Sequence, residues 1–207
     1  MTSNIKPRGY FEKLLFIDCE TSGLAFNSVD PSYDEATGKT YQAVSWGMVV
    51  TDAQTLKAIE RLYVEIKWDG KSEWSVDAQR VHGLSLEYLE EHGMTDEEAV
   101  VAIAELILKY WGPDGVVCVG GHNVATFDLP FLRRLLTDNG IHVKFGSRVV
   151  DTNSLGFGTF GTFISDDLFD TVGIPERGEH NALADADAAR IAVQRVRKMF
   201  TQCLNAE

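Results

Sequence analysis

The apolar pattern near the start of the chain constrains the fold more than any other feature. Residues 13–19 contain the continuous apolar run 14–17, which is typical of a strand buried on both faces. Residues 43–51 form a second strand pattern, and residues 58–67 alternate, with Leu62, Val64 and Ile66 on one face. We predict that these strands form an antiparallel meander, with the polar residues 27–40 as a long loop or insertion between the first two.

The rest of the chain alternates between helix and strand patterns. Residues 95–111 form the clearest helix, because Thr95 and Glu98 have capping-box spacing and Gly112 supplies a stop. The other predicted elements are short helices within 76–92, strands at 116–119 and 148–150, and helices at 128–138 and 181–200. The stripe of the last helix is Leu183, Ala186, Ala189, Val193, Val196 and Phe200. This order predicts an α/β fold, a mixed five-stranded sheet flanked by helices, in a single domain spanning residues 1–207.

Composition narrows the class of protein. A formal net charge of −12 argues against a protein that coats nucleic acid by neutralising phosphates, although it is compatible with an enzyme that grips one strand end. Three widely spaced cysteines without a C-x-x-C pair favour free thiols in a reducing compartment. The first 13 residues lack the apolar stretch of a signal peptide, and the apolar runs are too short to cross a membrane. We therefore expect a cytoplasmic protein.

Two acids stand where the first predicted strand ends. Asp18 and Glu20 are two positions apart, so their side chains point to the same side of the strand. Two carboxylates placed together repel each other unless a cation lies between them, and hard oxygen ligands suit magnesium or manganese. The alternative is that the acids only lead the strand into a loop.

Two later segments carry further polar residues of this kind. Asp128 follows a buried strand and opens a helix, where it could hold a metal or serve only as an N-cap. His180 lies just before the last predicted helix, and Asp185 looks inward from its second turn. A histidine in this place is often only a surface or capping residue. Asp187 faces away from Asp185, so we predict that it is a solvated helix charge.

Taken together, the pattern resembles the DEDDh exonucleases of the ribonuclease-H-like superfamily. It combines Asp-x-Glu on the first strand, Asn-x-x-x-Phe-Asp in the middle and His-x-x-x-x-Asp at the last helix. This family includes the proofreading subunit of bacterial DNA polymerase III, oligoribonuclease and ribonuclease T. The resemblance implies that two divalent cations, Mg²⁺ or Mn²⁺, are held by Asp18, Glu20, Asp128 and Asp185. It also implies that His180 is the general base.

The same resemblance implies a set of substrate-binding residues. The segment Thr21, Ser22, Gly23 and Leu24 is similar to the family segment that cups the terminal nucleotide, with Leu24 against the base. His82, Gly83 and Leu84 are similar to a segment that stacks on the last bases, although His82 could equally be a plain surface histidine. Asn123 and Phe127 belong to the middle motif and are placed at the substrate on the same ground.

Other segments depart from the family pattern or carry a lesser role. Asp151 and Thr152 also fit the family, and we assign them a structural role only. The loop at 27–41 is longer than in compact members, and Trp46 stands where many relatives have an aliphatic residue. We predict that the glycine-containing stretch 144–163 is a mobile flap near the site.

The expected reaction is removal of 5′-mononucleotides from the 3′ end of single-stranded nucleic acid, with DNA favoured. One alternative is an enzyme acting on short RNA, like oligoribonuclease, since the contacts to a 2′-hydroxyl cannot be located in the sequence. A second alternative is a catalytically idle module that binds a strand end or a protein. The resemblance allows a polymerase or replication partner and a homodimer, and we expect no membrane association.

Overall fold

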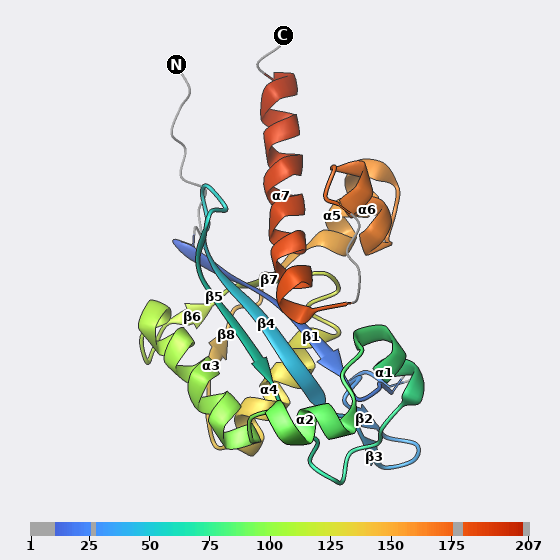
Figure 1. The fold of residues 1–207 in the computed structure, drawn as a ribbon. Coiled ribbons are helices and arrows are strands. Elements are labelled where there is room, and N and C mark those ends of the chain that lie inside the picture. Colours follow the sequence, from blue (N-terminus) through green and yellow to red (C-terminus); the bar gives the residue numbers. More distant parts are fainter. Residues whose placement is uncertain (1–10, 26–27, 176–179, 205–207) are drawn as a thin grey trace.

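A computed structural model describes residues 11–25, 28–175 and 180–204. In these residues the main sheet has five strands in the order β5-β4-β1-β7-β9 (Figure 1). The strands are β1 Lys13–Thr21, β4 Ala43–Asp52, β5 Ala58–Glu65, β7 Val119–Gly121 and β9 Val150–Asp151. β1, β4 and β5 pair antiparallel, whereas β7 pairs parallel to both β1 and β9. The predicted mixed five-stranded sheet, including its antiparallel meander, is confirmed.

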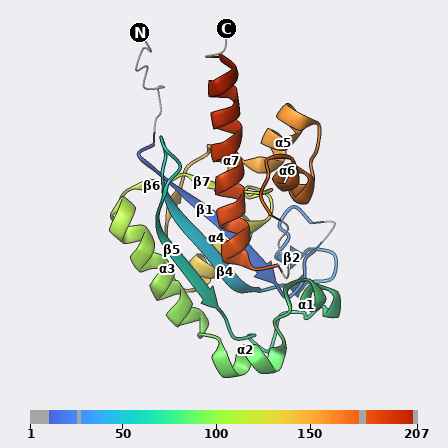
Figure 2. The same cartoon turned by 45° about the horizontal axis from the view of Figure 1, so that its top comes forward.

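Helices cover both faces of this sheet. α7 Ala182–Leu204 crosses one face over β1 and β4, and α5 Thr152–Phe160 and α6 Ser165–Thr171 lie beside it (Figures 1 and 2). α3 Asp96–Trp111 and α4 Asp128–Asp138 pack against the opposite face. The short helices α1 Val76–His82 and α2 Leu86–His92 lie near the end of the sheet at which β1 and β5 finish.

The position of β1 explains its unbroken apolar sequence. Leu15 and Ile17 join the hydrophobic cluster under α3 and α4, whereas Leu14 and Phe16 join the cluster under α7. Because successive side chains alternate between the two faces, a strand covered on both sides needs apolar residues at every position. The central strand that carries the first two acids is therefore held from both sides.

The capping box predicted for α3 is present. The Thr95 hydroxyl oxygen accepts from the backbone N–H of Glu98 at 3.2 Å, and the Glu98 carboxylate accepts from the N–H of Thr95 at 2.9 Å. These bonds satisfy backbone donors that have no partner within a helical turn. The helix begins at Asp96, as the spacing indicates.

Several elements differ from the sequence prediction. The predicted strand at 116–119 is split, because β6 Val116–Val117 pairs with β8 Lys144–Phe145 outside the main sheet. The predicted flap at 144–163 instead contains β8, β9 and α5, and α6 follows it. Part of the predicted loop at 27–40 folds into the hairpin of β2 Tyr33–Asp34 and β3 Lys39–Thr40.

Two predictions for α7 are wrong. Phe200 belongs to the predicted apolar stripe but is 55% exposed, because the last turns of α7 extend beyond the sheet (Figure 1). Asp187 is not a solvated charge, since its carboxylate accepts from Arg61 at 2.8 Å and from Arg190 at 2.5 Å.

The N-terminal prediction rests largely on residues 1–10, which lie outside the described residues, as does Asn27 at the start of the predicted loop. Among the helices that the structure describes, none combines the length and apolar character needed to span a bilayer.

Candidate active site

A pocket of about 150 Å³ opens where β1 ends beside the start of α7. Predicted site residues that line it are Asp18, Glu20, His180 and Asp185. Asp18 and Glu20 come from β1, whereas His180 and Asp185 come from a segment 160 residues later. The fold therefore brings these four side chains together, at the carboxyl end of a central strand, which is where α/β sheets commonly place ligands.

A glycine in β4 allows the start of α7 to pack directly against the sheet. A Cβ atom added to Gly47 of β4 would lie 2.1 Å from the carbonyl carbon of Ala182 and 2.2 Å from its oxygen. Gly47 is also the pairing partner of Asp18 in β1. Only a residue without a side chain lets the backbone of α7 approach this closely, so Gly47 sets the distance between the β1 acids and the helix.

The first turn of α7 is fixed by a polar cap. The Asn181 side-chain oxygen accepts from the N–H groups of Leu183 and Ala184, each at 3.1 Å. This bonding is the usual way in which Asn satisfies the free donors at a helix start. His180 directly precedes this cap and Asp185 follows one turn later, so the cap fixes the backbone on both sides.

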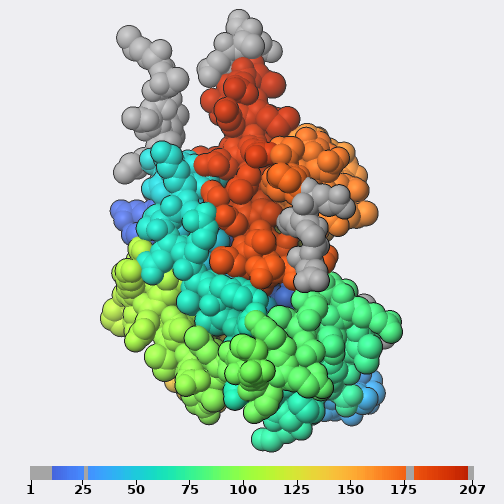
Figure 3. Space-filling model, viewed as in Figure 1, coloured from blue at the N-terminus to red at the C-terminus, as the bar shows by residue number. Residues whose placement is uncertain are grey.

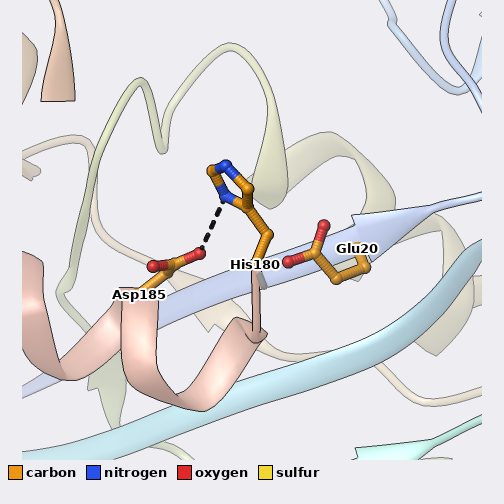
Figure 4. A group of neighbouring side chains, drawn as sticks. All are labelled: Glu20, His180 and Asp185. Atoms are coloured by element: carbon orange, nitrogen blue, oxygen red, sulfur yellow. Dashed lines mark hydrogen bonds and ion pairs between the residues drawn. The ribbon is translucent and has the colours of Figure 1, made fainter. Parts of the chain in front are cut away.

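Glu20, His180 and Asp185 form a compact group (Figure 4). One potential ligand atom from each residue lies within 4.8 Å of the other two, close enough to contact a single metal ion. His180 Nδ1 lies 3.3 Å from Asp185 Oδ2, while the His180 side chain keeps 46% of its surface exposed. An ionised carboxylate can only accept, so in the neutral form of the ring Nδ1 would carry the proton and Nε2 the lone pair.

Asp128 lies beneath the same strand end and is 1% exposed. Its Oδ1 accepts from the backbone N–H of Cys19 at 2.9 Å, which ties α4 to β1 between Asp18 and Glu20. Burial raises the pKa of Asp128 to about 7. Hydrogen bonds from Cys19 lower this pKa, whereas the negative charge of Glu20 raises it further. The N-cap alternative is wrong, because Phe127 occupies the cap position of α4 and the Asp128 side chain bonds to β1 instead.

The second oxygen of Asp128 is the clearest indication that this site would hold a cation. Oδ2 is buried and has no hydrogen-bond partner among the described residues. A buried carboxylate oxygen without a partner is costly, and native proteins rarely leave one. A divalent cation would supply the partner and favour the charged form, and carboxylate oxygens are the ligands that magnesium and manganese prefer. The residues present therefore fit the metal that the sequence implies.

The segment at the end of β1 is largely buried. Thr21 is 7% exposed and Ser22 is fully buried, with the Ser22 hydroxyl accepting from the N–H of Gln42 at 3.0 Å. At Gly23 (φ +149°), an added Cβ would meet the Tyr41 ring at 2.8 Å. Leu24 remains half-buried. This turn is thus held in one conformation between β4 and α1.

His82 is buried, so the alternative of a plain surface histidine is wrong. It is 4% exposed, its Nδ1 accepts from the N–H of Leu84 at 3.0 Å, and its ring meets Trp74 edge-on at 6.2 Å. Burial lowers the pKa of His82, and the nearby backbone of Thr21 offsets part of this decrease in pKa. Gly83 ends α1 with a left-handed φ of 74°. These contacts link α1 to the turn that follows β1.

The two remaining predicted residues lie around the loop before α4. Asn123 is exposed with a φ of 55°, and its N–H donates to Asp151 Oδ1 at 3.0 Å. Phe127 is half-buried and packs against Phe131, with ring centroids 5.5 Å apart. Asp151 also caps α5 through the N–H of Asn153, so it joins two loops at the sheet edge, in the structural role expected for it.

Four further residues line the pocket without having been predicted there: Cys19, His122, Ser165 and Phe169. His122 follows β7, and its Nδ1 lies 3.0 Å from the Thr152 hydroxyl. Since β7 is parallel to β1, its end meets the same edge of the sheet, and this rule could have located His122 from the sequence. Ser165 and Phe169 belong to α6, which gives no clear helix signal in the sequence.

The mixed sheet, the acids at the end of its central strand, the histidine just before the last helix and the acid on that helix define a nuclease of the ribonuclease-H-like superfamily. Comparison with known proteins agrees, because the model of the RNase T exonuclease family matches residues 15–192. The chain belongs to this exonuclease family.

Solved structures with the same fold include exonuclease I. Escherichia coli exonuclease I in complex with a dT13 oligonucleotide superposes with a TM-score of 0.74 at 16% identity, over 95% of this chain and 43% of that one. A moderately thermophilic exonuclease I from Methylocaldum szegediense gives 0.69 at 20% identity, over 90% and 40%. The chain thus spans under half the length of these proteins.

A curated relative of a different kind matches part of the chain. Leucine–tRNA ligase of Pseudomonas putida is 25% identical over 155 residues, covering 74% of this chain and 18% of the ligase.

Proposed function

We propose that this protein is a metal-dependent 3′→5′ exonuclease that releases 5′-mononucleotides from single-stranded nucleic acid, with DNA favoured. The observation that carries the proposal is the meeting of Asp18, Glu20, Asp185 and His180 at one pocket. Beneath it lies the buried carboxylate of Asp128, whose second oxygen has no hydrogen-bond partner within the described part of the chain. Two of the Escherichia coli exonuclease I structures with the same fold are described as complexes, one with a dT13 oligonucleotide and one with ssDNA, which supports the substrate class.

Asp18, Glu20, Asp128 and Asp185 would hold the cations, which we propose to be two Mg²⁺ or Mn²⁺ ions. When bound, such ions lower the pKa of a coordinated water and stabilise the charge on a leaving 3′-oxygen. Asp128 and Glu20 are buried, so the protein holds their oxygens in place before metal arrives. This rigidity favours a defined coordination geometry over a flexible one.

His180 would act as the general base. Asp185 holds Nδ1, which orients the ring and leaves Nε2 to accept a proton from the attacking water. The exposed side chain of His180 can then pass that proton to solvent. A single strand is the fitting substrate, because the terminal base must leave a stack to enter the pocket.

We further propose that residues 1–207 act as one exonuclease domain, because both hydrophobic clusters share the strands of one sheet. The second candidate function is that of an oligoribonuclease-like enzyme. The pocket volume of about 150 Å³ does not distinguish an RNA substrate from a DNA substrate. The idle-module alternative is disfavoured because it predicts a broken set of acids, whereas each family position is filled.

The test is digestion of a 5′-labelled single-stranded DNA with Mg²⁺ or Mn²⁺, resolved at single-nucleotide resolution, with a matched RNA in parallel. We expect a ladder that shortens from the 3′ end and is abolished by EDTA. Asp185→Asn should abolish it, whereas Asp138→Asn, at an exposed position on α4, should not. Strand binding without metal-stimulated cleavage of either polymer would refute the proposal and favour the idle module.

A further inference from the structure

An exposed pair of stacked phenylalanine rings lies close to the pocket. Phe157 of α5 and Phe163 of the α5–α6 turn have ring centroids 4.3 Å apart and planes 6° from parallel. Despite this contact Phe157 is 54% exposed and Phe163 is 55% exposed. Phe160 and Ile164, which are close to the pair in sequence, are also exposed. We call Phe157 and Phe163 the aromatic platform.

The platform is built by the fold and is not a chance contact of loose side chains. The Asn153 amide donates to the carbonyl of Phe163 at 3.1 Å, and Thr162 bonds both Asp167 and the N–H of Ile164. Gly156 allows the turn to fold back, since an added Cβ would lie 2.8 Å from the carbonyl oxygen of Thr162. These contacts hold the turn so that one ring covers the other.

The platform is continuous with the candidate active site. Ser165 and Phe169 of α6 line the pocket, and Ser165 is two residues after Phe163, a span of at most about 7 Å. α5 and α6 lie beside α7, whose start borders the pocket (Figures 1 and 3). A strand whose 3′ nucleotide enters the pocket can therefore pass the platform with the nucleotides that precede it.

We propose that the aromatic platform is a stacking site for the bases upstream of the nucleotide being removed. This inference rests on the proposed function and adds to it a second subsite for single-stranded substrate. Flat ring faces match base faces of any sequence, and exposed aromatic rings bind single strands in this way. The neighbouring acids Asp166, Asp167 and Asp170 repel phosphates, so the bases and not the backbone face the rings.

The platform also explains how an acidic protein could bind a negatively charged single strand. With a net charge of −12, the protein has little general attraction for a polyanion. Stacking supplies affinity that does not depend on neutralising phosphates. The contribution of the platform to KM should therefore be the same at low and high salt, unlike that of phosphate-binding lysine or arginine residues.

The test uses the double variant Phe157→Leu with Phe163→Leu, which keeps the surface apolar but removes the flat rings. On a long single strand we expect KM to rise about 10-fold at unchanged kcat, with the same ratio at low and high salt. On the p-nitrophenyl ester of thymidine 5′-monophosphate, which has no upstream base to stack on the platform, the variant should equal wild type. Phe157→Trp should retain the wild-type KM because it keeps a flat ring.

The matched control is Phe200→Leu, the same change at a ring that is 55% exposed near the far end of α7. It should leave KM unchanged. An unaltered KM for the double variant on long strands would overturn the platform while leaving the exonuclease proposal intact. Loss of a dimer in the double variant, seen by sedimentation with KM unchanged, would show instead that the rings bind a second copy of the chain.

If wild type cleaves no strand, the exonuclease proposal fails and the platform is tested by binding alone. Anisotropy of a labelled single-stranded oligonucleotide, measured in EDTA, should then show weaker binding by the double variant than by wild type or Phe200→Leu. Equal binding by all three proteins, or no binding by wild type, would overturn the platform.

Discussion

Replacing Gly47 by alanine tests whether the close packing of α7 on β4 determines the positions of the active-site residues. The new Cβ would lie 2.1 Å from the carbonyl carbon of Ala182, and ordinary contact begins at 3.4 Å, so one backbone must move by about 1.3 Å (3.4 − 2.1). The three atoms nearest to the new Cβ are backbone atoms of Ala182 and Leu183, which cannot rotate out of the way. Asp185 is on the first turn of the helix that must shift, and His180 lies two residues before its start.

A shift of this size matters more for catalysis than for folding. Misplacement of catalytic groups by about 1 Å can cost about 100-fold in rate, whereas overpacking costs about 1–3 kcal/mol of stability. We therefore expect Gly47→Ala to lower kcat/KM by about 100-fold and to weaken Mn²⁺ binding, with the circular dichroism spectrum unchanged and the melting temperature lowered by about 2–10 °C.

The assay compares single-strand hydrolysis and Mn²⁺ titration for wild type, Gly47→Ala and the control Gly146→Ala. At Gly146 an added Cβ has its nearest neighbour at 3.4 Å, an ordinary contact with a Val116 side chain. The control should match wild type in both measurements. Wild-type activity and metal affinity in Gly47→Ala would refute the reasoning that this glycine sets the spacing of the site.

Three further substitutions give separate expectations. Asp128→Asn keeps an acceptor for the Cys19 N–H but removes a buried charge, so hydrolysis should fall at least about 100-fold while the melting temperature in metal-free buffer rises. Arg190→Ala should lower stability by about 3 kcal/mol in urea unfolding, because Arg190 is buried and bonds both Asp187 and the carbonyl of Leu56. Thr95→Ala removes the α3 cap and should cost about 1 kcal/mol in the same measurement.

Each of these has a matched control and a contradicting result. Arg80→Ala breaks an exposed ion pair with Asp77 and should leave stability unchanged, so an equal loss in both arginine variants would contradict the role of burial. Asp138→Asn should keep full activity. If Thr95→Ser loses as much stability as Thr95→Ala, the hydroxyl is not the stabilising group.

The sequence predicted the central part of the fold because those segments carry strong local signals. The two-faced burial of β1 requires an unbroken apolar run, and the α3 cap requires Thr95 and Glu98 at fixed spacing. The segment of α5 carries no such signal. It contains Gly156 and Gly158, which disfavour a helix. The helix is stabilised by contacts with α6 and α7, which the helix propensity of the segment itself does not reveal.

The sequence also predicted which residues meet at the pocket, but not how buried contacts hold them there. The acids and His180 occupy recognisable positions, and the pocket brings four of the five predicted catalytic residues together. The burial of Asp128 beneath Cys19 and the seat of α7 on Gly47 depend on contacts between distant segments, so no local pattern predicts them. The burial of His82 against Trp74 is of the same kind.

The most direct test of the metal site is anomalous X-ray scattering from crystals of the protein grown with Mn²⁺. We predict manganese peaks within about 2.2 Å of carboxylate oxygens of Asp18, Glu20, Asp128 and Asp185, with the second oxygen of Asp128 among the ligands. Crystals of Asp128→Asn should lose at least one peak. Saturating Mn²⁺ with no peak in contact with these four side chains would contradict the assignment of this pocket as a metal-dependent nuclease site.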